Sequence, residues 1–109
     1  MYAINEGQAK INGVMVETFE REVIEEDTVL RVEAGTTGYR GGERDQGGRT
    51  YLCIDCLYGD FFFSPVTDDK KRVVGIEIAC SGDDGMNAIM KAMEFMHKAI
   101  HDQRCEVDE

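Results

Sequence analysis

The sequence predicts an α+β fold, in which hairpins form a twisted antiparallel β-sheet and a C-terminal α-helix packs on it. Two observations lead to this prediction. Up to about residue 80, stretches of alternating apolar and polar residues are separated by turn residues, which is typical of hairpins. Beyond that point the apolar residues recur three and four positions apart, the spacing of one helix face. A chain of 109 residues buries one modest core, so we expect a single domain over residues 1–109, β-rich in 1–80.

Turn residues separate several of the strands expected in residues 1–80. Asn12-Gly13 stands between alternating flanks, which is the strongest short signal for a hairpin. Residues 28–35 alternate like a strand with one buried face and lead into a glycine-rich loop at residues 35–48. After the loop, the sequence predicts strands in "RTYLCIDCLY", "FFFSPV" and "RVVGIEIAC", separated by Gly59-Asp60 and by "TDDKK".

The C-terminal segment predicts one helix over about residues 84–103. Ser81, Asp83 or Asp84 can cap its start, and Lys98 and Arg104 suit the negative end of its dipole. Its methionine-rich stripe is typical of core packing, although such a stripe also serves as an adaptable interface. One helix on one sheet face buries only part of the apolar surface of the chain. We therefore expect a second copy of the chain to cover the remainder, including Phe61, Phe62 and Phe63. The stripe consists of Met86, Ile89, Met90, Met93, Met96 and Ile100.

The chain is acidic, with 12 Lys and Arg against 22 Asp and Glu and a net charge of −10. Two interpretations of this acidity stay open. The charges either serve ordinary solubility, or they imitate the phosphates of DNA and bind the basic groove of a partner protein. It argues against duplex nucleic acid as the ligand, because proteins that bind duplexes present a net basic face. No stretch approaches transmembrane length, and "MYAINEGQAK" lacks the apolar run of a signal peptide, so we expect neither a membrane partner nor export.

Patterns for catalysis or metal binding are weak. Cys53 and Cys56 form a Cys-x-x-Cys pair, but within a predicted strand their sulfurs point to opposite faces, which suits structural thiols better than zinc or redox chemistry. His97 and His101 stand four apart on one helix face, a spacing that can hold a metal, but no partner ligands are evident. The sequence shows no general base positioned to activate a serine or cysteine nucleophile. We therefore expect no catalytic residue, no metal site and no cofactor.

The glycine-rich loop is the most specific feature of the sequence. It holds six of the twelve glycines and two arginines, and a third arginine, Arg49, follows it directly. It is not a Walker loop, since no Gly-Lys-Ser/Thr follows, and not a dinucleotide fingerprint, since a strand follows it. Glycines let backbone N–H groups reach an anion, and threonine and arginine side chains add donors for phosphate. We expect a phosphorylated ligand or a partner here, with a ligand-free hairpin loop as the alternative; the candidate binding residues are Thr36, Thr37, Gly38, Arg40 and Arg49.

The segment "VEAGTTGYRGGERDQGGRTY", followed by a short sheet and a C-terminal helix, resembles the phage anti-Thoeris family 1 proteins. These are small viral sponges that sequester cyclic ADP-ribose signals made by bacterial TIR-domain enzymes. The resemblance implies dimers that can assemble into hexamers, ligand pockets between protomers, binding without cleavage, and action in the cytoplasm of the infected bacterial host. Some members are also described as holding cyclic oligonucleotides in separate pockets.

The resemblance also implies further ligand-binding residues. The asparagine at the start of the family's helix matches Asn87, and an arginine near the C-terminus matches Arg104. The N-terminal aromatic residue has Phe19 as its counterpart, and the arginine that follows is Arg31, with Arg21 as the alternative. Because 17 helical residues, about 25 Å, separate Asn87 from Arg104, two protomers with antiparallel helices are needed to bring both to one small ligand.

The leading interpretation is therefore a non-enzymatic, oligomeric sponge for cyclic nucleotide immune signals that blocks TIR/Thoeris-type signalling. The alternative is an acidic, DNA-mimic-like inhibitor that binds a host defence protein. A third candidate, a phosphodiesterase or glycohydrolase acting on the same signals, lacks a visible catalytic constellation.

Overall fold

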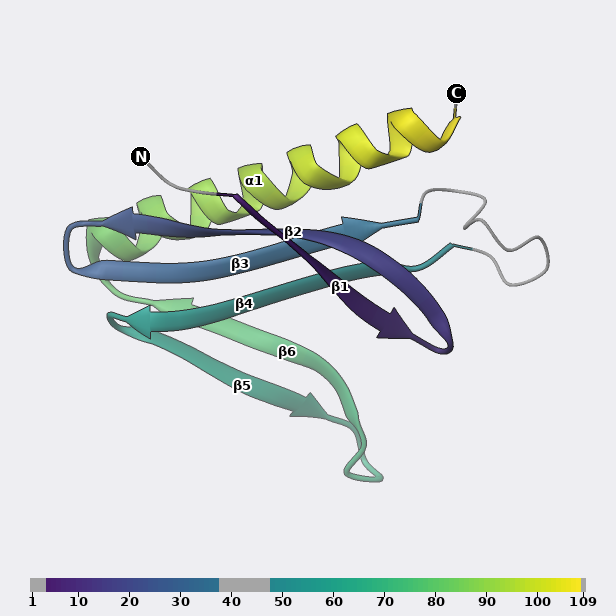
Figure 1. The fold of residues 1–109 in the computed structure, drawn as a ribbon. Coiled ribbons are helices and arrows are strands. Elements are labelled where there is room, and N and C mark those ends of the chain that lie inside the picture. Colours follow the sequence, from purple (N-terminus) through teal and green to yellow (C-terminus); the bar gives the residue numbers. More distant parts are fainter. Residues whose placement is uncertain (1–3, 38–47, 109) are drawn as a thin grey trace.

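The computed structural model describes residues 4–37 and 48–108, the last four by their backbone alone. It confirms the α+β class, with antiparallel strands and one C-terminal helix packed on a sheet (Figure 1). In chain order, the elements are β1 (Asn5–Ile11), β2 (Val14–Glu25), β3 (Thr28–Thr36), β4 (Thr50–Tyr58), β5 (Phe61–Thr67), β6 (Val73–Cys80) and α1 (Gly82–Asp108).

The strands form two sheets where the sequence predicts one. β1 to β4 make a four-stranded sheet in chain order, whereas β5 and β6 pair in a separate two-stranded sheet. The separation begins at Gly59 between β4 and β5, whose φ of +126° is open to glycine but strained for other residues. The chain turns out of the main sheet at this point. Residues 61–80, hereafter the arm, therefore project away from it (Figure 1).

The register of the main sheet sorts its side chains between two faces. The turn at Asn12 (φ 49°) and Gly13 (φ 85°) has the two positive φ values of a tight hairpin, which confirms the predicted turn. In the β2–β3 ladder, Arg21 lies opposite Val32 and Val23 lies opposite Leu30, so these four side chains share one face. That face carries the helix.

The core lies between α1 and strands β2 and β3, and the helix runs along these two strands (Figure 1). Leu30 and Val32 are fully buried, and the helix meets them with Ala88, Ala92 and Met96. Because the two alanines are small, the helix backbone can lie close to the sheet. The burial of these apolar side chains stabilises the packing of the helix on the sheet.

The helix is longer than predicted, and its core face includes only Ile89, Met96 and Ile100 of the predicted stripe. It spans Gly82–Asp108 instead of residues 84–103, and its last turn carries no basic residue, so the predicted pairing of Lys98 and Arg104 with the helix end is wrong. Of the predicted methionine stripe, Met96 is buried, while Met86, Met90 and Met93 are 51%, 48% and 54% exposed. The stripe of small alanines, which approaches the sheet most closely, takes the core position instead.

Candidate functional site

Hydrogen bonds close the base of the glycine-rich loop. The Thr37 N–H donates to the Arg49 carbonyl (3.0 Å), and the Arg49 N–H donates to Thr37 Oγ1 (3.0 Å). The Thr36 hydroxyl donates to the same Arg49 carbonyl (3.2 Å) and lies 2.9 Å from the Thr50 hydroxyl. Three predicted ligand donors, Thr36, Thr37 and Arg49, thus lie together at the loop base and hold it shut. Gly38 and Arg40, predicted with them, lie outside the described residues.

Gln103 fastens the helix to this loop base. Its side chain is buried, with Oε1 accepting a hydrogen bond from the Thr36 N–H (2.9 Å) and Nε2 donating to the Glu17 carbonyl (2.9 Å). Both backbone groups belong to strands, Thr36 to β3 and Glu17 to β2. One side chain therefore fixes the position of the C-terminal half of α1 against the start of the loop.

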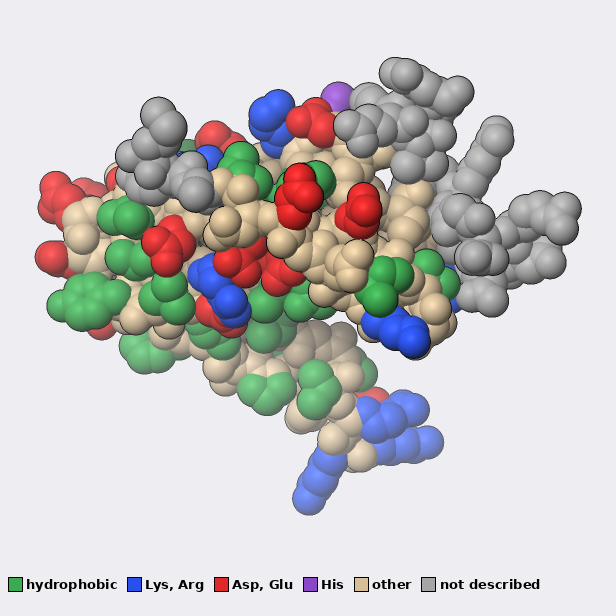
Figure 2. Space-filling model, in the orientation of Figure 1, with side chains coloured by type: hydrophobic (Ala, Val, Ile, Leu, Met, Phe, Trp, Pro, Cys, Tyr) green, Lys and Arg blue, Asp and Glu red, His purple; other side chains and the backbone are tan. Residues whose placement is uncertain are grey.

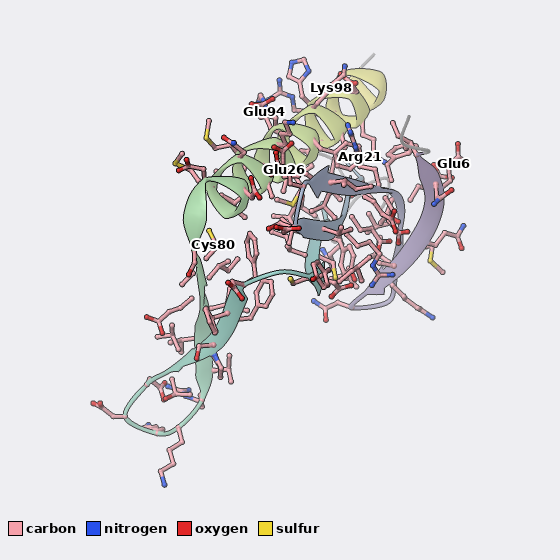
Figure 3. The ribbon with its side chains drawn as sticks, turned by 90° about the vertical axis from the view of Figure 1, so that its left-hand side faces the viewer. Glu6, Arg21, Glu26, Cys80, Glu94 and Lys98 are labelled. Carbon is pink, nitrogen blue, oxygen red and sulfur yellow. The ribbon has the colours of Figure 1, made fainter. Side chains whose placement is uncertain are left out.

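A groove of about 360 Å³ lies beside Gln103, between α1 and the main sheet. Phe19 and Arg21 reach it from β2, because residues two apart on a strand share a face. Phe95 and Lys98 reach it from the helix, where residues three apart are neighbours. Arg21 and Lys98 lie on the same side of the helix–sheet junction (Figure 3). The lining residues are Ile4, Phe19, Arg21, Phe95, Lys98, Ala99, Asp102 and Gln103.

Positive charge and aromatic surface meet in this groove. The Arg21 guanidinium stands 5.6 Å from the centre of the Phe95 ring, a distance at which a cation is attracted to the ring face. Lys98 Nζ donates to Asp102 Oδ2 (3.1 Å), and this hydrogen bond holds the pKa of Asp102 below its ordinary value. A second hollow of about 350 Å³ continues past Arg21, Phe95 and Lys98 and adds Lys91, which is ion-paired with Glu25.

Arg31 is placed elsewhere. It projects from the sheet face opposite the helix, because it alternates with the buried Leu30 and Val32 on β3. Its guanidinium donates to Asp55 (2.9 Å from Nε) and to Glu20 (3.4 Å), and the hydrogen bond to Asp55 raises the pKa of Arg31. Of the two arginines considered from the sequence, Arg21 shares the groove with Phe19, and Arg31 does not.

The two predicted helix residues lie far apart. Asn87 is exposed in the first turns of α1, and Arg104 follows Gln103 near the loop base. Figure 1 shows the helix running straight between these ends, which agrees with the separation of about 25 Å expected for 17 residues. Within one chain, Arg104 lies near the loop and Asn87 lies at the other end of the molecule.

The thiols and imidazoles show no common centre in the described part of the chain. Cys53 pairs with Glu33 and Cys56 with Leu30, so the two sulfurs lie on opposite faces of β4, as the strand pattern predicts. The rings of His97 and His101 lie 6.0 Å apart on the helix. Within residues 4–37 and 48–104, no three His, Cys, Asp or Glu side chains are arranged to hold a metal ion.

Phe95, Lys98 and Gln103 were missed as site residues from the sequence, and Arg21 was considered only as the alternative to Arg31. The available signal was the spacing of Phe95, Lys98 and Asp102, which places one aromatic and two charged residues on one side of a helix. A spacing on the helix cannot show which strand lies beside it. Only the packing of α1 on β2 brings these residues to Phe19 and Arg21.

The chain matches no protein-family model, no curated protein and no solved structure. In the part of the chain that the structure describes, no helix combines the length and the apolar character needed to cross a membrane.

Proposed function

We propose that this protein is a non-enzymatic sponge that binds and sequesters cyclic nucleotide immune signals. The ligand class is cyclic ADP-ribose isomers, with cyclic oligonucleotides as further candidates, and binding blocks TIR/Thoeris-type signalling in the cytoplasm of an infected bacterial host. The observation that carries the proposal is the groove beside Gln103, in which two aromatic rings and two cationic side chains come together. The resemblance of residues 32–51 to anti-Thoeris family 1 proteins supports it.

The composition of the groove suits a nucleotide. Phe19 and Phe95 offer apolar ring surface against which a base can stack. Arg21 and Lys98 offer charged donors for phosphate oxygens, and a guanidinium can bind two such oxygens at once. A volume of about 360 Å³ is at the lower end of ligand pockets, so the groove takes one nucleoside portion of the ligand rather than all of it.

Tight binding needs a site that is already formed. A sponge competes with the receptor for its signal, and nanomolar affinity corresponds to about −12 kcal/mol. Gln103 ties the helix to both strands, and the loop base is closed by its own hydrogen bonds, so little ordering remains to oppose binding. The acidity of the remaining surface repels other nucleic acids.

The proposal is tested by isothermal titration calorimetry with cyclic ADP-ribose isomers and cyclic di- and trinucleotides. We expect Arg21→Ala to weaken binding at least tenfold, about 1.4 kcal/mol, because a charge-assisted hydrogen bond to phosphate is lost. Lys10→Ala is the matched control, since it removes one exposed cation on β1 away from the groove. Arg31→Ala distinguishes the two arginines, and we expect it to bind like the wild type.

Recovery of the ligand separates the three candidate functions. The complex is heated and the released nucleotide is identified by mass spectrometry. Intact nucleotide supports a sponge, whereas a cleaved product identifies an enzyme. Absence of binding to every nucleotide in the panel rejects the proposal and leaves the protein-directed inhibitor.

A further inference from the structure

We propose that the arm docks on the arm of a second copy of this chain, with its basic tip in the acidic hollow at the base of the partner's arm. This inference concerns assembly and goes beyond the nucleotide-binding proposal, since it uses none of the groove residues. It starts from an arm that stands apart from the helix and the main sheet (Figure 3). An isolated two-stranded sheet is marginally stable in water at best, so the arm requires cover.

One face of the arm is apolar along its whole length. In the β5–β6 ladder, Phe61 lies opposite Cys80, Phe63 opposite Ile78, and Pro65 opposite Ile76, and alternation places all six on one face. The other face has the polar pair Ser64 and Glu77 at its middle. The apolar face is therefore the face that a partner covers.

This face is an extension of the protein's own core into solvent. Phe61 packs against the core cluster, and its ring stacks on Phe63 with 6.2 Å between centroids. The exposed fraction of the residues on this face rises toward the tip of the arm, from 37% at Phe63 and 40% at Ile78 to 64% at Ile76. Val73 and Val74 add exposed apolar side chains near the tip, whereas Phe62 and Val66 belong to the opposite face. A contiguous apolar face of this kind is typical of a contact site.

The charges of the arm identify the occupant. Its tip carries Lys70, Lys71 and Arg72 next to Asp68 and Asp69, a local excess of positive charge in a chain of net charge −10. Figure 2 shows these cationic side chains projecting at the end of the arm. Asp68 is turned back into its own turn, where it accepts hydrogen bonds from the Lys70 and Arg72 N–H groups (2.9 and 3.0 Å). The lysines remain for a partner of opposite charge.

A complementary surface exists on this same chain, at the base of the arm. A hollow of about 770 Å³ lies there between the β2–β3 turn, the β4–β5 turn and the start of α1. Figure 2 shows acidic side chains gathered at this end of the molecule. The carboxylates that line the hollow are Asp27, Asp60, Asp83 and Asp84.

Two-fold symmetry joins the two surfaces. When two arms meet by their apolar faces across a two-fold axis perpendicular to the arms, they run antiparallel, and the tip of each falls beside the base of the other. Strands of seven and eight residues give an arm of about 25 Å, so tip and base cannot meet within one chain. A second copy of the chain offers one arm both surfaces, the apolar face and the acidic hollow. Such a copy is present wherever the protein is made.

Sedimentation velocity over micromolar concentrations tests the inference on the whole chain. We expect a wild-type dimer that Ile76→Asp, on the apolar face, weakens at least tenfold. Ser64→Asp, on the opposite face of the same arm, is the matched control and keeps the wild-type dimer. A monomeric wild type overturns the inference, as does a dimer on which Ile76→Asp has no more effect than Ser64→Asp.

A charge exchange tests the register of the two copies. Lys70→Glu with Lys71→Glu, or Asp83→Lys with Asp84→Lys, should each weaken the dimer about tenfold, and the four changes together should restore most of it. Lys10→Glu and Glu6→Lys on β1 control for net charge, and circular dichroism checks that each variant is folded. Failure of the exchange to restore the dimer overturns the placement of the tip in the hollow. Since no nucleotide is present, the outcome is independent of the ligand-binding test.

Discussion

Gln103 is the side chain on which the geometry of the candidate site depends most. It is 8% exposed and satisfies the Thr36 N–H and the Glu17 carbonyl at once. Removing it leaves two backbone groups without these partners, and a buried group that loses its hydrogen bond costs about 1–3 kcal/mol. We therefore expect Gln103→Ala to lower the free energy of unfolding by about 2–4 kcal/mol, measured by urea denaturation.

Gln8→Ala is the matched control for this prediction, because Gln8 is exposed on β1. A surface change of this kind shifts the free energy of unfolding by about 0.5 kcal/mol or less. Equal stability of the two variants would show that Gln103 does not fasten the helix to the loop base.

The arm holds its own turn through one carboxylate. Asp68 accepts from the Lys70 and Arg72 N–H groups and from Arg72 Nε (2.9 Å), and the backbone hydrogen bond from Arg72 is the main cause of the lowered pKa of Asp68. A carboxyl group whose pKa is lower in the folded state stabilises that state above its unfolded pKa, and this contribution disappears as the pH falls through the folded value. The ordinary value for Asp is 3.8, so the turn should loosen below about pH 3.8.

Amide resonances of Lys70 and Arg72, followed by NMR from neutral to acid pH, measure this effect. We expect both to titrate together with a midpoint below 3.8, and Asp68→Asn to abolish that titration. Asp69→Asn is the control and leaves the titration in place. A midpoint above 3.8 in the wild type would contradict the role of Asp68 in the turn.

At the scale of the whole molecule, the core cluster of the described residues lies between α1 and the main sheet. The chain is flat, 45 × 44 × 17 Å, so this one layer of buried side chains holds sheet and helix together. Leu30 lies at its centre, fully buried. We expect Leu30→Ala to lower the free energy of unfolding by about 2–5 kcal/mol, in a transition that helix and sheet signals report at the same urea concentration.

Leu52→Ala provides the comparison for this core prediction. Leu52 is 55% exposed on β4, so truncating it removes much less buried surface and leaves no cavity. If both variants lost the same stability, the buried layer under α1 would not be the main source of the stability of the fold.

Several elements of the fold could be predicted from local sequence alone. Asn12-Gly13 defines its hairpin because both residues tolerate positive φ, and the alternation in residues 28–35 marks a half-buried strand wherever it lies. The opposite orientation of Cys53 and Cys56 follows from the two-residue period of a strand. These features depend on neighbours in the chain, which the sequence contains.

The candidate site could be predicted only in part. Phe19 and the loop-base residues Thr36, Thr37 and Arg49 were among the expected residues, and Arg21 was the alternative to Arg31. Phe95, Lys98 and Gln103 were not expected. The loop-base threonines close the loop through hydrogen bonds that depend on the meeting of β3 with the segment before β4. Such contacts join residues far apart in the chain, and no local pattern encodes them.

By itself, the sequence determined the fold class, three of the turns, the alternating faces of residues 28–35 and the acidity of the chain, because propensity, periodicity and charge are properties of adjacent residues. Only the tertiary structure decided that β5 and β6 leave the main sheet and that Arg21 shares a groove with Phe95. It also decided that Ala88 and Ala92 face the core beside Met96, while the other methionines of the stripe are exposed. These outcomes depend on how closely backbones approach one another, and that is fixed when the helix packs on the sheet.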